Sequence, residues 1–316
     1  MIKWDEHVAD YLRLRRQLGF TLARDEHLLG QFTTHLTVAG AEALTIADAI
    51  AWAGLLPEGV TDRPATRAST RLTAVRGFAA YLHTLDPVHE IPPRAVFSRH
   101  VPRPTPHIYT HAEVTALIDA AERLNGGVRA RTYPVLFGLL AATGVRVGEA
   151  LALDRDEADL QAGVLTISRG SKSRHPRLVP LHSTTTAVLS RYAAWRDEQE
   201  PKPGGENAAF FIDQGSDRLD YMNVRYAFVQ ASTASGLRTV AQRPRMHDLR
   251  HTFAVNTLLG WYRSGVDVAA KMPTLSTYLG HTDPANTYWY ISAVPELLAH
   301  AAARLAAADA REQAGS

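Results

Sequence analysis

The sequence contains no cysteine among its 316 residues. Neither a disulfide framework nor a thiolate metal site is therefore possible, and a cytoplasmic setting fits this composition. Net charge is almost missing as well, because 34 Lys and Arg residues stand against 32 Asp and Glu residues, giving a formal charge of +2. So small an excess gives no argument for a nucleic-acid partner, and any affinity for DNA has to come from local clusters of basic residues.

Long hydrophobic runs are absent too. No uncharged apolar stretch approaches the length of about 18 residues that a transmembrane helix requires. The N-terminal segment is charged and helix-like, without the apolar core of about 7 to 15 residues that marks a signal peptide, so we expect no signal peptide. The length suggests two domains, at roughly 150 residues each.

A proline-rich segment at residues 99–106 separates the two parts. Pro102, Pro104 and Pro106 alternate with other residues, which excludes a helix and favours an extended linker. Before the linker, residues 1–98 show apolar residues at helical spacing in four stretches: about 3–18, 23–39, 45–55 and 66–85. They predict a small helical domain.

Three arginines in this half are candidates for contact with a phosphate backbone. Arg67 and Arg71 lie one turn apart in the fourth stretch, and Arg103 lies in the linker, which contains no acidic residue. The alternative, an ordinary solvated helix face, is the more common role for any single one of them.

The second part, residues 107–316, predicts a mainly helical domain with a small antiparallel sheet. Thr110 and Glu113 have the spacing of a capping box, so a helix should run from about 111 to 124. The apolar patterns at 164–167 and 178–181 indicate two short strands. The basic segment between them, residues 169–177, then forms a hairpin tip.

Several polar residues in this part stand in informative local contexts. Arg146 follows a glycine turn, with Glu149 three residues later on the same helix face. The alternative for this pair is a surface ion pair. In the hairpin, Lys172 can reach a DNA groove or donate a proton, because lysine pKa values fall readily near other cations; a solvated turn is the alternative. Arg174 and Arg177 flank it as further candidates for DNA contact.

The most specific local motif is Arg245-Met246-His247-Asp248-Leu249-Arg250-His251. His247 and Arg250 are three residues apart and share one helix face, and Arg245 precedes them as another candidate for DNA contact. A metal site here is disfavoured because the His-Glu-x-x-His pattern is missing. Further on, His281 follows a glycine at the end of a helix, and Tyr290 comes nine residues later.

These motifs, in this order, resemble the tyrosine recombinases, also called the phage integrase family. The resemblance covers about 190 positions, from Thr105 to about Leu298. The matching elements are the Thr-Gly-Val-Arg-Val-Gly-Glu box, the hairpin lysine, His-Asp-Leu-Arg-His, Leu-Gly-His, and the tyrosine nine residues further on. The segments 275–281 and 287–290 also resemble a subgroup carried on transposons and other mobile elements.

The resemblance implies a catalytic set of Arg146, Lys172, His247, Arg250, His281 and Tyr290. Two arginines suit a phosphodiester, whose non-bridging oxygens gain negative charge in the transition state. Tyr290 is then the nucleophile that forms a 3′-phosphotyrosyl link, with His247 as the candidate base and His281 as a hydrogen-bond partner of the phosphate. Lys172 protonates the departing 5′-oxygen. No cofactor and no metal is implied.

Neighbouring residues receive supporting roles. Glu149 is expected to orient other groups. Tyr288 competes as nucleophile, but residues two apart in a helix differ by about 200° and cannot both face one phosphate, so Tyr288 and Trp289 are interpreted as packing residues. Pro295 begins an amphipathic C-terminal helix. The family resemblance favours docking of this helix on a neighbouring subunit, and docking on its own domain is the alternative.

The sequence therefore predicts a site-specific DNA recombinase or integrase, built from a helical, SAM-like core-binding domain (1–98), a linker (99–106) and a catalytic domain (107–316). Expected partners are a double-stranded recombination site, further copies of the chain in a tetramer and related recombinases, in the cytoplasm at the nucleoid. The alternatives are a type IB topoisomerase-like relaxing enzyme, a non-catalytic DNA-binding regulator of the same fold and, least favoured, a metallohydrolase.

Overall fold

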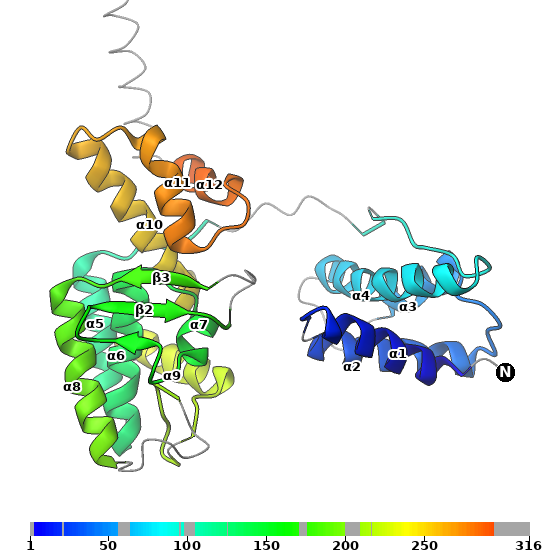
Figure 1. Ribbon diagram of the computed structural model, residues 1–316, viewed down its shortest axis with the longest axis horizontal. Coiled ribbons are helices and arrows are strands. Elements are labelled where there is room, and N and C mark those ends of the chain that lie inside the picture. The colour runs from blue at the N-terminus through cyan, green and yellow to red at the C-terminus, as the bar shows by residue number, and fades with distance from the viewer. Residues whose placement is uncertain are drawn as a thin grey trace, which may run out of the picture. The chain divides into compact units, whose positions relative to one another are not determined.

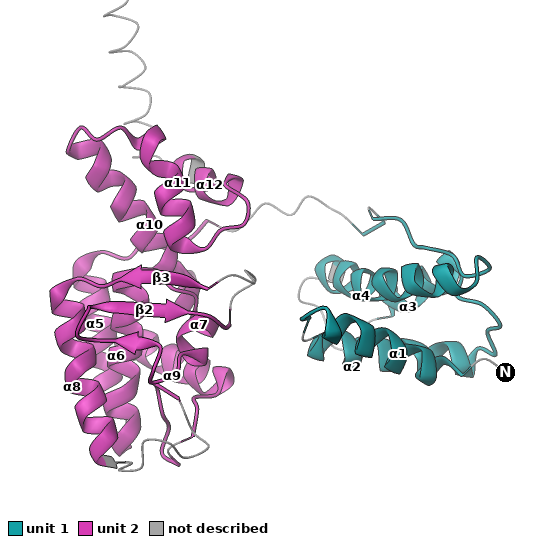
Figure 2. Ribbon diagram, viewed as in Figure 1, with its two compact units in different colours: residues 1–103 teal, residues 104–316 magenta. Residues whose placement is uncertain are grey.

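The structure is a computed structural model (Figure 1). It describes residues 3–20, 22–55, 64–94, 96–97, 105–124, 126–170, 176–199, 209–215 and 217–293. The chain divides into two compact units, residues 1–103 and 104–316 (Figure 2). The division falls inside the proline-rich segment predicted to be a linker. Lys172, Arg103, Arg174 and the helix expected from Pro295 lie outside the described residues.

The described residues of the first unit form the four expected helices. They are α1 (Trp4–Gln17), α2 (Ala23–Val38), α3 (Ile46–Gly54) and α4 (Pro64–Leu85). Their apolar faces meet in one core, where Phe32 and Phe78 are fully buried and the rings of Phe32 and Trp52 lie 5.1 Å apart. Thr45 caps α3 by accepting a hydrogen bond from the backbone N–H of Asp48, which fixes where this helix begins.

The second unit is mainly helical, with a three-stranded antiparallel sheet in the order β1-β2-β3. Its elements are α5 (His111–Glu122), α6 (Gly127–Thr143), α7 (Val147–Ala152), β1 (Ala158–Asp159), β2 (Val164–Ile167), β3 (Arg177–Pro180), α8 (Ser183–Gln199), α9 (Tyr221–Ala234), α10 (Met246–Arg263), α11 (Val268–Leu279) and α12 (Ala285–Ala293). The fold class predicted from the sequence is confirmed. The capping box of Thr110 and Glu113 is present, and strand β1 was not predicted.

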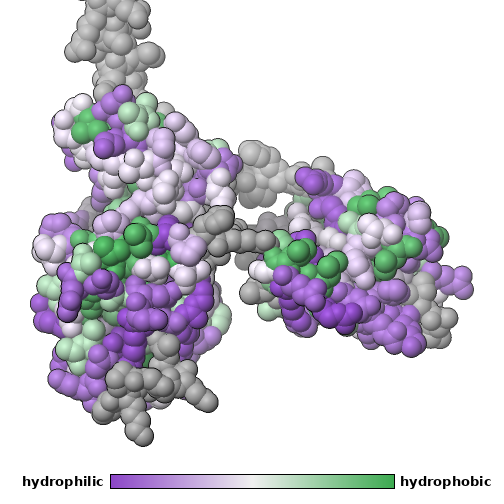
Figure 3. All heavy atoms as spheres, in the orientation of Figure 1, coloured by the Kyte–Doolittle hydropathy of each residue, from purple (hydrophilic) through white to green (hydrophobic). Residues whose placement is uncertain are grey.

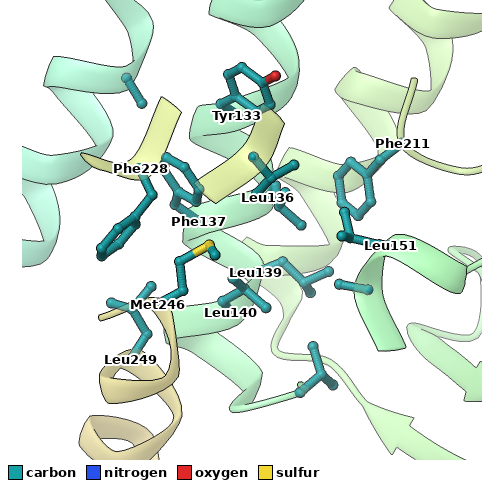
Figure 4. Close-up of a cluster of buried hydrophobic side chains, with 14 of the residues drawn as sticks. Tyr133, Leu136, Phe137, Leu139, Leu140, Leu151, Phe211, Phe228, Met246 and Leu249 are labelled. Atoms are coloured by element: carbon teal, nitrogen blue, oxygen red, sulfur yellow. The ribbon is translucent and has the colours of Figure 1, made fainter. Parts of the chain in front are cut away.

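The larger core of this unit anchors the start of α10. Met246 and Leu249 of α10 are buried together with Phe137 and Leu140 of α6 and Phe228 of α9 (Figure 4). A helix that buries one face in this way has little freedom to rotate. His247 and Arg250, which follow these two anchors along the chain, are therefore held in fixed directions around the helix axis.

A second core joins the end of α10 to α11 and α12. Leu258, Leu275, Leu279 and Tyr290 are buried in it. Pro273 lies inside α11. These contacts fix α12, and with it Tyr290, against the helix that carries His247 and Arg250.

The exposed large apolar side chains of the described residues include Leu55, Val240 and Tyr288. In the view of Figure 3, hydrophilic residues cover much of each unit, and the hydrophobic patches are separate. Tyr288 is 51% exposed, which contradicts the packing role expected for it, whereas Trp289 does pack against the second core. None of the helices in the described ranges combines the length and the apolar character needed to cross a membrane.

Candidate active site

A glycine turn places Arg146. Helix α6 ends at Gly144, which has φ +62°, a left-handed conformation that costs L side chains energy. A Cβ built at Gly144 would also lie 2.7 Å from Cδ1 of Phe253 on α10. Glycine is thus required both for the turn and for the close approach of α10, and Arg146 emerges beside that helix.

Arg146 and Arg250 meet at the end of α11. Nη2 of Arg146 donates to the carbonyl oxygen of Gly280 at 3.0 Å, and Nη2 of Arg250 donates to that of Leu279 at 2.7 Å. Arg250 also donates from Nη1 to the carbonyl oxygen of Gly144 at 2.7 Å, although its side chain is only 2% exposed. One buried guanidinium thereby ties the turn after α6 to the turn after α11.

The charge of Arg250 survives its burial. Desolvation, followed by repulsion from Arg146, lowers the pKa of Arg250 to about 10. The group is therefore still protonated at neutral pH. Because the two carbonyls that it contacts are neutral, they satisfy its hydrogen bonds without cancelling its charge. Together with Arg146, this makes a local positive field suited to an anion.

His281 is fixed by a second glycine turn. Gly280 has φ +67° and ends α11, and the N–H of His281 then donates to the carbonyl oxygen of Ser276 at 3.0 Å. Nδ1 of the His281 ring lies 2.7 Å from Oγ1 of Thr287, which leaves Nε2 as the nitrogen available to a ligand. Burial and then the charge of Arg250 lower the pKa of His281 to about 4, so the ring is neutral at pH 7.

Tyr290 lies among these groups. Tyr290 is only 2% exposed. Its ring stacks on that of His281, with the ring centroids 6.2 Å apart and an interplanar angle of 22°. The ring of His251 approaches from α10 at 5.5 Å. The exposed Tyr288 points elsewhere, as the helical angle between residues two apart requires.

Two histidines of α10 line the remaining side of the candidate site. The rings of His247 and His251 contact edge to face at 4.7 Å. His247 is exposed when its whole surface is considered. Desolvation of its ring, and then the charge of Arg250, lowers the pKa of the ring to about 4. It is therefore neutral at pH 7 and able to accept a proton.

Sequence reasoning overlooked His251. It stands four residues after His247, and this spacing alone puts both rings on one helix face. Its ring lies between those of His247 and Tyr290, and its Nδ1 is buried with no hydrogen-bond partner in the described part of the chain. No three His, Cys, Asp or Glu side chains within the described ranges are placed to hold a metal ion.

Two of the arginines expected to contact DNA are engaged inside the protein. Arg177 binds Glu149 through Nη1 and Nη2 at 3.0 and 2.7 Å, and its side chain is 9% exposed. Arg71 stacks on Trp52, with Cζ 3.9 Å from the ring centroid, and donates to the carbonyl oxygen of Leu55. Each guanidinium therefore already has partners within its own unit, and the phosphate contact expected from the sequence stays a prediction.

The other two described candidates are more accessible. Arg67 is exposed on α4. Arg245 precedes α10 with its side chain 46% exposed, and its guanidinium pairs with Asp248 at 2.6 Å. Asp248 is buried, but nearly half of the Arg245 side chain stays exposed at 46%. These two positions remain candidates for DNA contact.

Comparison with known proteins agrees with this geometry. A model of the Phage integrase family matches residues 108–296. The chain is 37% identical to a Sinorhizobium fredii protein named as an integrase/recombinase, y4rB, over 96% of this chain and 98% of that protein. It is also 30% identical to tyrosine recombinase XerD of Caulobacter vibrioides, over 75% and 73% of the two chains. The chain belongs to the phage integrase family. It is a tyrosine recombinase, an enzyme that cuts and rejoins DNA.

Solved structures show the same fold. A transposon Tn1549 integrase in complex with transposon right end DNA superposes with a TM-score of 0.65 at 15% identity, covering 90% of this chain and 93% of that one. A lambda integrase dimer bound to a core site gives 0.57 at 18% identity, covering 89% and 95%. At such low identity these matches show only that this tyrosine recombinase shares their fold, that is, their arrangement of helices and sheet.

Proposed function

We propose that this recombinase cuts one strand at a specific DNA site with Tyr290 and keeps the broken end as a 3′-phosphotyrosyl link. The supporting observation is that Arg146, Arg250, His281 and Tyr290 converge on the two helix-ending turns at Gly144 and Gly280. A phosphodiester seated there meets two guanidinium groups and a histidine Nε2 beside the tyrosine ring.

The first step is a transesterification at phosphorus. The bond between Oη of Tyr290 and phosphorus forms while the bond from phosphorus to the 5′-oxygen breaks. The phenolic proton passes to a base, and His247 is suited to this because it is neutral at pH 7. The 5′-oxygen takes a proton from Lys172, which follows from the family resemblance of the hairpin.

The arginines supply most of the rate enhancement in this proposal. Negative charge on the non-bridging oxygens grows in the transition state, and donors already in place stabilise it without reorganisation. Arg250 is held by two carbonyls before DNA arrives, so its orientation is fixed in advance. The phosphotyrosyl link conserves the bond energy, and attack by a second 5′-hydroxyl reverses the step and rejoins the strands.

The proposed partners are a duplex recombination site and further copies of the chain. Relatives of the same fold support both, since lambda integrase is known as a dimer on a core site and as a tetramer on a Holliday junction. The match to a transposon integrase supports a role on a mobile element. We infer that the reaction takes place on DNA in the cytoplasm, at the nucleoid.

Nicked duplexes tiled across the DNA that flanks this gene test the proposal. A nick beside the cleavage point releases the 5′-hydroxyl fragment and traps the covalent protein–DNA adduct, which survives denaturing electrophoresis. Adducts at one position, formed in excess chelator, are the expected result. Strict dependence on magnesium, or cleavage without an adduct, would contradict the proposed chemistry.

A further inference from the structure

Glu149 is the most completely buried carboxylate near the site. Its side chain is 0% exposed, and it accepts hydrogen bonds from the backbone N–H and Nη1 of Arg146, both at 2.8 Å. Nη1 and Nη2 of Arg177 bind the same two oxygens at 3.0 and 2.7 Å. One carboxylate therefore lies between two guanidinium groups, one from α7's N-terminus and one from the first residue of β3.

The remaining nitrogen of Arg177 is engaged as well. Nε donates to the carbonyl oxygen of Tyr278 at 2.9 Å, beside the turn whose carbonyls accept from Arg146 and Arg250. The guanidinium also lies directly against Gly280, where an added Cβ would be 2.9 Å from Cζ of Arg177. All three nitrogens of this side chain thus point to protein atoms inside the catalytic unit.

The charge balance explains why the second arginine matters. If Arg146 alone faced Glu149, the pair would be neutral and would attract a phosphate poorly. With Arg177 sharing the carboxylate, the group of three carries a net positive charge, which attracts a phosphate. Burial alone would raise the pKa of Glu149, but the hydrogen bonds from Arg177 and Arg146 lower it to about 2.

We propose that Arg177 is a positioning residue for the recombinase reaction: it orients Arg146 through Glu149 and braces the Gly280 turn, and it does not contact DNA. This inference rests on the proposed role of Arg146 at the scissile phosphate. It also replaces the interpretation of Arg177 as a DNA-contacting residue, and the two interpretations predict different measurements.

A double-mutant cycle on strand cleavage separates them. Arg177→Gln and Glu149→Gln are each expected to slow adduct formation on the trapped duplex by about tenfold or more, whereas adding Arg177→Gln to Glu149→Gln costs less than about threefold. Arg177→Lys keeps the charge but loses the paired hydrogen bonds, so it should slow cleavage almost as much as Arg177→Gln. Multiplying effects in the double variant, or a wild-type rate in Arg177→Lys, would overturn the proposal.

Binding to a random-sequence duplex gives an independent readout. A residue that neutralises one phosphate contributes about 0.9 to the slope of log affinity against log salt. The slope is expected to be unchanged in Arg177→Gln and reduced in Arg245→Gln, whose side chain is far more exposed. A reduced slope in Arg177→Gln would show that Arg177 contacts DNA.

Acid unfolding tests the contact without any catalysis. A carboxylate with a depressed folded-state pKa stabilises the fold above its unfolded pKa, and this contribution is lost as pH falls through the folded value. Arg177→Gln raises the folded pKa of Glu149, so acid unfolding should move to higher pH, and Glu149→Gln should remove the shift. Arg196→Gln is the matched control, because Arg196 is a similarly buried arginine paired with Asp197.

The control is expected to lower the free energy of unfolding by a similar amount across the acid range, whereas the loss in Arg177→Gln should shrink as pH falls and Glu149 becomes protonated. An equally pH-dependent loss in Arg196→Gln would count against Glu149 as the link. The unfolding cycle is measurable on protein without DNA. Absence of adducts in the wild type would therefore overturn the proposed function, while the unfolding data still decide whether Arg177 acts on Glu149.

Discussion

Two turns of the catalytic unit share one backbone conformation, but different side chains pack against them. At each, a helix ends in a left-handed glycine, Gly144 or Gly280, and a functional side chain follows within two residues. The space that a Cβ would fill is occupied by the ring of Phe253 at the first turn and by the guanidinium of Arg177 at the second.

The first turn is therefore supported by an aromatic ring and the second by a charged side chain. The turn that carries Arg146 is set by hydrophobic packing, so its geometry depends on the stability of the core. The turn that carries His281 is set by hydrogen bonds and charge, which are sensitive to pH and to the loss of a single partner. Arg250 contacts a carbonyl of each turn and makes the two act as one site.

Of the substitutions at these turns, one of Arg250, which contacts both of them, is expected to slow cleavage most. Arg250→Lys keeps a positive charge but cannot donate to the carbonyls of Gly144 and Leu279 while also facing a phosphate. Adduct formation on the trapped duplex should fall by about 10²- to 10³-fold, the cost of losing one preorganised oxyanion donor. A loss below tenfold would mean that the turns hold their geometry without Arg250.

Gly144→Ala disturbs the turn against which Phe253 packs. The positive φ and the clash with Phe253 together should lower the free energy of unfolding by about 2 to 4 kcal/mol, measured by chemical denaturation. Gly260→Ala is the matched control on α10, because, apart from its own helix backbone, no atom of the described residues lies within 4 Å of its added Cβ. That variant should be neutral or stabilised by up to about 1 kcal/mol.

Gly280→Ala breaks the polar turn. Its added Cβ meets the end of a side chain instead of an aromatic ring, so we expect a smaller loss of stability, about 1 to 2 kcal/mol, mostly from the positive φ. Displacing Arg177 also disturbs Glu149, and cleavage should slow more than stability alone explains. Equal stability losses at Gly144 and Gly280 would remove the distinction between the two supports.

The smallest expected effect concerns the orientation of His281. Thr287→Val preserves the shape of the side chain but removes the hydroxyl that holds Nδ1. A lost hydrogen bond of about 1 kcal/mol corresponds to cleavage slowed roughly fivefold. Thr287→Ser should restore the rate, and if it behaves like Thr287→Val, the methyl group and not the hydroxyl positions the ring.

The sequence predicts most clearly those features that depend on local order. The helices of the first unit, the Thr110 capping box and the glycine turns follow from spacing and residue type, and the catalytic candidates stand inside short motifs. His251 was also within reach, since its spacing from His247 places it on the same helix face.

Contacts between residues distant in sequence were missed. Arg177 binds Glu149, 28 residues away in sequence, and Arg71 stacks on Trp52. A basic residue looks the same in a sequence whether it faces solvent or a buried carboxylate. Strand β1 has only two residues and pairs with β2, which leaves too short a pattern to detect.

The most direct test compares the two tyrosines of α12 on the trapped duplex. Tyr290→Phe removes the buried hydroxyl beside His281, whereas Tyr288→Phe removes an exposed one two residues earlier. We predict that Tyr290→Phe binds the duplex normally and forms no covalent adduct, and that Tyr288→Phe forms it at the wild-type rate. Adducts that persist in Tyr290→Phe and vanish in Tyr288→Phe would contradict the account.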